Sequence, residues 1–141
     1  MANIKCDVVR RGRSYRVFRY WLPLLSYAWL IFHLSSISHV ELPSVFDFPN
    51  SDKVIHFFEY GGLGFLCVRA IRFRYRDIRQ AEILAFFLCL LYGATDEIHQ
   101  LFVPGRNSSL TDLLADGIGA AVGAIFYFIL RKQLYGKNSS L

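Results

Sequence analysis

The chain has 141 residues, 54% of which are hydrophobic, and it carries a net charge of +5. This length suits a single domain, and the apolar fraction exceeds the roughly 45–50% that is usual in a soluble domain. Its basic residues flank apolar runs instead of forming a stripe that could follow a groove, which argues against a nucleic-acid partner and indicates a protein of the lipid bilayer.

Residues 1–19 form a basic arm, which we expect in the cytoplasm, and a first apolar run follows from Tyr20 to about Ser36. We expect this run to be a membrane helix with Pro23 in its first turn, a position that suits proline. A cleaved signal peptide is the alternative, since the run has a basic front and a weak small-residue cleavage site at 36–38. Cleavage would leave three spans, with the C-terminus still inside.

Three further apolar runs follow, over residues 53–68, 81–100 and 110–130. Each is close to the ~20 residues that cross a hydrocarbon core of ~30 Å, and the shorter ones would need a thinned bilayer or adjoining residues. The sequence therefore predicts an all-α, polytopic four-helix transmembrane bundle over residues 20–132. A polar cytoplasmic tail at 133–141 completes the predicted organisation.

The distribution of Lys and Arg predicts the orientation of the bundle. With the N-terminus inside, the cytoplasmic segments hold six, five and three of the sixteen basic residues, and only Lys53 and Arg106 lie outside. Because basic residues are enriched in cytoplasmic loops, we expect an N-in/C-in topology.

Ionisable side chains gather at the predicted outer ends of the last three helices. In the second helix, Asp52, His56 and Tyr60 recur every four residues and share one face with Glu59. The remaining members lie in the last turn of the third helix, the connecting loop and the fourth helix: Asp96, Glu97, His99, Gln100, Arg106, Asp112 and Asp116. An ionisable group costs roughly 2.5–3.5 kcal/mol at the centre of a span, so this concentration predicts a functional pocket.

Some members of this cluster also have simpler structural explanations. Asp52 could cap the second helix, and Lys53 could extend to the lipid head groups. Asp112 is favoured by the dipole at the start of the fourth helix. Arg106 is either an exposed loop charge or a partner of Asp112, whereas Asp116 lies deeper and is not explained in these ways.

Small residues follow one face of the fourth helix at Ala115, Gly119 and Gly123, and the second helix has three glycines within 61–64. Because small residues let membrane helices approach closely, we expect these two helices to pack tightly. This packing would bring together side chains of both helices: His56, Glu59, Asp112 and Asp116. A dimer interface is the alternative for the small-residue face.

Taken in order, these residues resemble the VanZ-like family. Residues 52–65 (DKVIHFFEYGGLGF) resemble its first signature, and residues 92–106 (YGATDEIHQLFVPGR) resemble its second. The resemblance extends to two serines after the first apolar run and to the pattern of the final helix: Ser35, Ser36, Asp112, Asp116, Gly119 and Gly123. In all it covers about residues 20–130.

The resemblance has two local departures and one functional implication. Asp116 stands where the family often has Asn, and Asp96 and His99 look like features of one branch, whereas Glu97 and Gln100 belong to the minimal pattern. The family is named for an accessory protein of resistance to the glycopeptide antibiotic teicoplanin. The resemblance therefore implies a cell-envelope protein of the bacterial cytoplasmic membrane and a link to antibiotic resistance.

The first functional hypothesis is a site at the outer leaflet that binds or processes a lipid-linked or phosphorylated envelope precursor. Arg106 with Lys53 would hold a phosphate or carboxylate, and His56 or Glu97 would act as a general base. The other polar groups would hydrogen-bond the substrate: Asp52, Glu59, Tyr60, Asp96, Gln100, Asp112 and Asp116.

Three alternatives remain open, and with them the cofactor and the question of an enzymatic reaction. A metal-binding membrane enzyme would use two carboxylate–imidazole pairs, each one helical turn apart: His56 with Glu59, and Asp96 with His99. Asp112 and Asp116 would supply further acidic ligands from the fourth helix. A small proton-coupled transporter would relay protons through Glu59 and Asp116 and would need a homodimer. A structural membrane scaffold would use the polar groups only to join its helices.

Overall fold

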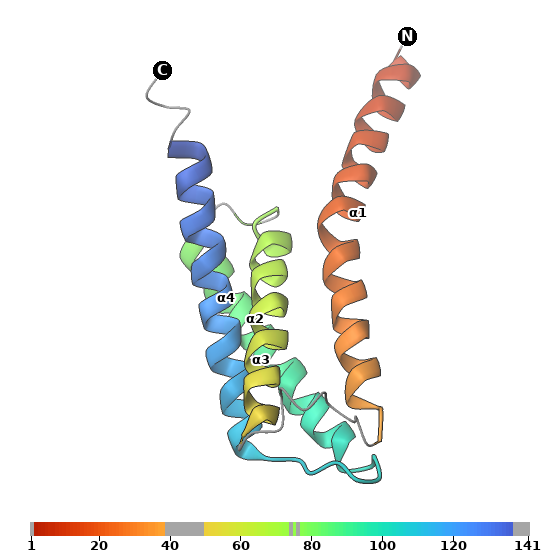
Figure 1. The fold of residues 1–141 in the computed structure, drawn as a ribbon. Helices are drawn as coiled ribbons and strands as arrows, with labels where there is room; N and C mark the ends of the chain where they lie inside the picture. The colour runs from red at the N-terminus through yellow and green to blue at the C-terminus, as the bar shows by residue number, and fades with distance from the viewer. Residues whose placement is uncertain (1, 39–49, 74, 76, 137–141) are drawn as a thin grey trace.

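The computed structural model describes residues 2–38, 50–73, 75 and 77–136, with side chains for residues 15, 17–38, 50–73, 75 and 77–134. These residues contain four helices and no strand: α1 (Ala2–Ser35), α2 (Ser51–Ile71), α3 (Ile78–Gln100) and α4 (Leu110–Gly136). The predicted all-α class is thus confirmed. Successive helices run in opposite directions, so that the start of α1 and the end of α4 lie at the same end of the molecule (Figure 1).

The two ends of the helix assembly differ, and we name them by their residues. The polar end comprises residues 34–36, 50–59 and 96–116, where α1 and α3 end and α2 and α4 begin. The arginine end is the opposite one and contains Arg19, Arg69, Arg72 and Arg131. Helices α2, α3 and α4 pack together, whereas α1 contacts α3 at the polar end, through Ser35 and Asp96, and α2 at the arginine end, where the rings of Tyr20 and Phe73 stack.

Helix α1 differs from its prediction because it begins at Ala2, within the basic arm, and not near Tyr20. Pro23 therefore lies inside the helix, where it has no N–H to donate to the carbonyl of Arg19, four residues earlier. That carbonyl instead accepts a long hydrogen bond from Nη2 of Arg69 in α2, at 3.5 Å. The proline thus frees a backbone acceptor that α2 uses to contact α1.

The close packing of α2 against α4 confirms the expectation from the small residues. A Cβ added to Gly119 would overlap the backbone of Phe57, and one added to Gly123 would overlap the carbonyl of Gly61. On the other side of the interface, Gly64 lies directly against the backbone of Ala120. The small-residue face is therefore occupied by α2 of the same chain.

Among the described side chains, many that lie on the outer surface of the four helices are large and apolar. Large apolar side chains are exposed on each helix, among them Leu25, Trp29, Phe58, Phe87, Leu91, Ile118 and Phe126. Within the described residues, α2 and residues 110–134 of α4 are long and apolar enough to cross a membrane. An exposed apolar surface of this extent indicates contact with lipid or with another protein.

Candidate functional site

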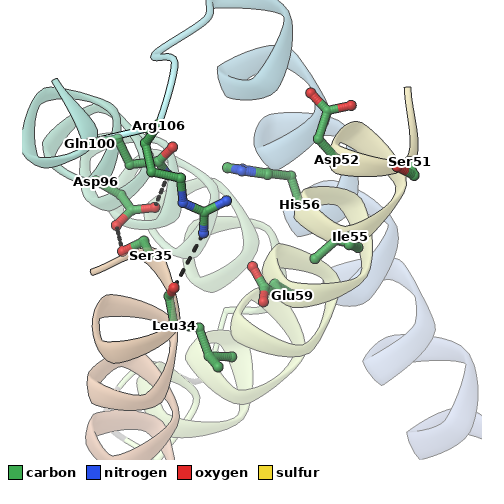
Figure 2. Close-up of a pocket in the computed structure, with 11 residues that line it drawn as sticks. Leu34, Ser35, Ser51, Asp52, Ile55, His56, Glu59, Asp96, Gln100 and Arg106 are labelled. Atoms are coloured by element: carbon green, nitrogen blue, oxygen red, sulfur yellow. Dashed lines mark hydrogen bonds between the residues drawn. The ribbon is translucent and has the colours of Figure 1, made fainter. Parts of the chain in front are cut away.

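A cavity of about 470 Å³ opens at the polar end, between α1, α2, α3 and the loop that precedes α4. Six of its lining residues belong to the predicted cluster: Asp52, His56, Glu59, Asp96, Gln100 and Arg106. Five others were not predicted as site residues: Leu34, Ser35, Ser51, Ile55 and Gly105. Figure 2 shows Glu59, Asp96 and Arg106 directed into the same space from three different parts of the fold.

Asp96 is the buried anchor of one cavity wall. Its Oδ1 accepts a hydrogen bond from Ser35 Oγ at 2.5 Å, and its Oδ2 accepts one from Gln100 Nε2 at 3.0 Å. Both oxygens are therefore engaged, and the first bond joins the end of α1 to α3 (Figure 2). The two serines that follow the first apolar run were part of the family resemblance, and they are the sequence signal for this contact.

His99 lies on the α1 side of α3 and does not line the cavity. Its Nε2 is 3.0 Å from Ser36 Oγ, and its ring packs against Phe32 with 4.5 Å between centroids. Of the four metal ligands suggested by the sequence, three line the cavity, whereas His99 is engaged with α1: His56, Glu59, Asp96 and His99.

Arg106 reaches back from the loop toward α1. Its Nη2 donates to the carbonyl of Leu34 at 3.2 Å, and its buried Nε has no hydrogen-bond partner among the described residues. Arg106 is partly exposed in the loop, and Asp112, the partner that the sequence suggested for it, pairs with Lys53 instead. The guanidinium thus retains hydrogen-bond donors at the cavity.

Lys53 is held by carboxylates and is not part of the cavity lining. Its Nζ lies 3.0 Å from Asp52 Oδ2 and 3.0 Å from Asp112 Oδ1, which is buried. The N-cap of α2 is Asn50, whose left-handed backbone has φ 64° and whose side chain makes no cap bond, and Asp52 lies in the first turn of the helix. Lys53 therefore balances charge between α2 and α4.

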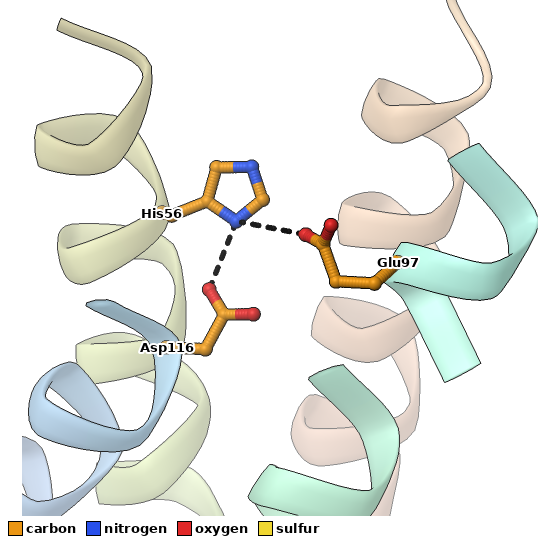
Figure 3. Close-up of side chains that lie close together, drawn as sticks. All are labelled: His56, Glu97 and Asp116. Carbon is orange, nitrogen blue, oxygen red and sulfur yellow. Dashed lines mark hydrogen bonds and ion pairs between the residues drawn. The ribbon is translucent and has the colours of Figure 1, made fainter. Parts of the chain in front are cut away.

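His56, Glu97 and Asp116 form a second buried group next to the cavity, which we call the triad. His56 Nδ1 lies 2.9 Å from Asp116 Oδ1 and 4.0 Å from Glu97 Oε1 (Figure 3). The three side chains come from α2, α3 and α4, and only His56 also lines the cavity. The tight α2–α4 packing thus brings His56 to Asp116, as the small-residue pattern predicts.

Three further residues shape the surroundings of the triad, and of these the sequence predicted only Tyr60 as a site residue. The backbone N–H of Ser109 donates to Glu97 Oε2 at 2.7 Å, which fixes the orientation of that carboxylate. A Cβ at Gly93 would lie 2.8 Å from Asp116 Oδ2, so the glycine leaves room for this oxygen. Tyr60, a predicted binding residue, is fully buried beside His56, and its hydroxyl has no partner among the described residues.

Comparison with known proteins identifies the family of the chain. A family model described as VanZ/LLP1 matches residues 10–131, which is most of the chain. The match includes both signature-like stretches, 52–65 and 92–106, and it confirms the resemblance noted from the sequence. No curated protein and no solved structure matches the chain.

Proposed function

The chain belongs to the VanZ/LLP1 family of membrane proteins, and from this premise we propose that its polar-end cavity binds the head group of an envelope lipid. The observation that carries the proposal is the cavity of about 470 Å³, which lies within the range of roughly 300–1,000 Å³ typical of ligand sites. Its polar lining lies at one end of helices with apolar outer surfaces. A lipid could therefore place its chains along the helices and its head group in the cavity.

The proposed membrane arrangement is four spans in the bacterial cytoplasmic membrane, with both termini inside. Helices α2 and α4 have the length and composition of spans, and α1 and α3 expose large apolar side chains along the same stretch. The alternating helix directions put the arginine end on one side, which the enrichment of basic residues in cytoplasmic segments assigns to the cytoplasm. The polar end would then face the outer leaflet.

This topology is tested by adding one cysteine at a time to a Cys6→Ser background, in which the two remaining cysteines, Cys67 and Cys89, are buried. An impermeant maleimide added to intact cells should label Asn107→Cys in the loop at the polar end. Gln133→Cys, near the end of α4, should react only after the membrane is permeabilised. Labelling of Gln133→Cys alone in intact cells would reverse the proposed orientation.

The lining favours a head group that combines many hydroxyl or amide groups with a single anionic group. Three carboxylates supply acceptors: Asp52, Glu59 and Asp96. Arg106 is the one Lys or Arg side chain among the described lining residues, and a guanidinium can bind a phosphate or carboxylate in bidentate fashion. A bare phosphate would meet excess negative charge, so a glycosylated or peptide-bearing phospholipid fits better. Lys53 has no part in this proposal, because it is bound to Asp52 and Asp112.

The proposal is tested by mass spectrometry of the lipids that co-purify with the full chain. Wild type should retain a polyprenyl-linked or phosphorylated glycan lipid, and Arg106→Ala should lose it. Arg79→Ala is the matched control, since Arg79 is exposed at the start of α3 and does not line the cavity. If wild type and Arg106→Ala carried the same bulk phospholipids, the head-group site would be wrong.

A further inference from the structure

We propose that the triad of His56, Glu97 and Asp116 binds a divalent transition-metal ion between α2, α3 and α4. One possible ligand atom from each side chain lies within 4.8 Å of those of the other two. Figure 3 shows both carboxylates directed toward the same ring nitrogen of His56. This proposal rests on the triad alone and does not depend on the proposed head-group site.

Two oxygens of the triad point to a missing partner. Glu97 Oε1 and Asp116 Oδ2 are buried and accept no hydrogen bond from any described residue. The two side chains are only 8% and 0% exposed, so bulk water does not supply the bond. A buried acceptor without a partner costs about 1–3 kcal/mol, and more when it is charged. A bound cation would give both oxygens a partner.

The charges of the triad also favour a bound cation. A protonated His56 would offset only one of the two carboxylates and would leave a net negative charge inside the bundle. An uncompensated buried charge is strongly destabilising. A divalent cation with a neutral imidazole would balance both carboxylates, and Lys53 cannot do so because it is bound to Asp52 and Asp112.

The ligands are already oriented by contacts with the rest of the protein. The N–H of Ser109 holds Glu97 Oε2 at 2.7 Å and leaves Oε1 of that carboxylate facing His56 Nδ1. His56 Nδ1 lies 2.9 Å from Asp116 Oδ1, and binding of the ion would release the proton between these two atoms, so that both become ligands. Gly93 provides the space beside Asp116 Oδ2. Contacts of this kind orient the ligands in metalloproteins and tune their affinity.

The donor set selects the class of metal. One imidazole with two carboxylates suits Mn²⁺, Fe²⁺ or Zn²⁺ better than Ca²⁺ or Mg²⁺, which prefer oxygen ligands alone. With bonds of about 2.0–2.2 Å, two ligand atoms of a tetrahedral ion lie about 3.3–3.6 Å apart, so Glu97 Oε1, which is 4.0 Å from His56 Nδ1, would move closer when the ion binds. Three protein ligands leave further coordination positions free, and His56 places the metal beside the cavity wall.

The experiment uses the full chain, purified in detergent with a tag that contains no histidine. The protein is stripped with EDTA, incubated separately with Mn²⁺ and Zn²⁺, desalted and analysed for metal by mass spectrometry. We expect about one ion of at least one metal per chain, together with a higher melting temperature, because the ion binds the folded state. Less than about a tenth of an ion per chain with both metals would overturn the proposal.

Matched variants show whether the triad is the site. Glu97→Gln should lower the bound metal at least about tenfold, whereas Glu82→Gln, the same change near the other end of α3, should leave it unchanged. Asp116→Asn is a second triad variant if Glu97→Gln does not fold. Equal metal content in a folded triad variant and in wild type would mean that the residues bind no metal. Since no lipid is needed, failure here is distinct from failure of the head-group proposal.

Discussion

The two ends of the bundle carry opposite charges and hold them in different ways. At the polar end, seven polar or charged side chains are buried, and most are bonded to another helix or loop: Ser35, His56, Asp96, Glu97, Gln100, Asp112 and Asp116. At the arginine end, a wider cavity of about 660 Å³ is lined by four arginines among aromatic and leucine side chains, with no carboxylate among its described lining residues.

This difference concerns how the charged side chains of each end find partners. Carboxylates buried within the bundle need partners in the protein or in a bound ligand, so their geometry has to be built residue by residue. Arginines near a membrane surface can instead find their partners in the phosphates of anionic lipids. The side chains of the polar end are therefore held mainly by contacts within the protein, whereas the cavity at the arginine end has no carboxylate among its described lining residues to pair with its arginines.

The largest loss of structure at the polar end is expected from a substitution that separates α2 from α4. Gly119→Ala would place a Cβ against the backbone of Phe57, next to His56, and backbone cannot move aside as a flexible side chain can. Overpacking of this kind costs typically 1–3 kcal/mol. We expect a lower melting temperature in detergent and loss of metal from the triad.

Gly117→Ala on the same helix is the control. Its Cβ would lie 3.5 Å from Leu90 Cδ1, which is an ordinary contact. Because Ala is favoured over Gly in a helix by about 1 kcal/mol, this variant should be as stable as wild type or more so. If both variants melted like wild type, the packing of α2 against α4 would not be what holds the polar end together.

The attachment of α1 to the polar end should be weaker. Ser35→Ala removes the bond to Asp96 Oδ1 and leaves that buried oxygen without its donor, at a cost of about 1–3 kcal/mol. Hydrogen exchange should rise in the last turns of α1 and stay unchanged in α2 and α4. Ser38→Ala, at an exposed position just beyond α1, should exchange like wild type. Faster exchange throughout the bundle would contradict a local role for this bond.

The features of the fold and the site that the sequence predicts are those that follow from periodic patterns of residues. Small residues every four positions predict the α2–α4 interface, and with it the approach of His56 to Asp116. Runs of apolar residues predict the helices, and the predicted starts of α3 and α4 lie within three residues of the observed ones. Helical spacing fixes which residues share a face, so such contacts can be inferred from one chain.

Contacts that depend on the third dimension were not predicted. Glu97 accepts a hydrogen bond from the N–H of Ser109, and no helical spacing relates this loop N–H to a residue twelve positions earlier. Lys53 was expected to reach the lipid head groups or a ligand, but the packing of α4 brings Asp112 within 3.0 Å of it. The start of α1 at Ala2 was not predicted, because the basic arm and Pro23 both suggested that the helix begins after the arm.

The smallest effect is expected at the arginine end, where single charges attract anionic lipid without a built geometry. An arginine near a membrane surface contributes about 1 kcal/mol to the binding of anionic lipid. Arg72→Gln should therefore weaken the binding of phosphatidylglycerol by about fivefold, measured by native mass spectrometry on the detergent-solubilised chain. Arg72 lines the cavity, and its buried Nε has no hydrogen-bond partner among the described residues.

Arg79→Gln removes the same charge from an exposed position that does not line this cavity, and it separates cavity binding from net charge. If the arginine end acts as a cavity, Arg72→Gln should weaken lipid binding more than Arg79→Gln does. If both variants weaken it equally, the end attracts lipid only through its total charge. In either variant the metal content of the triad should match that of wild type. The polar end and the arginine end are separated by the length of α2, and their two cavities share no lining residue (Figure 1).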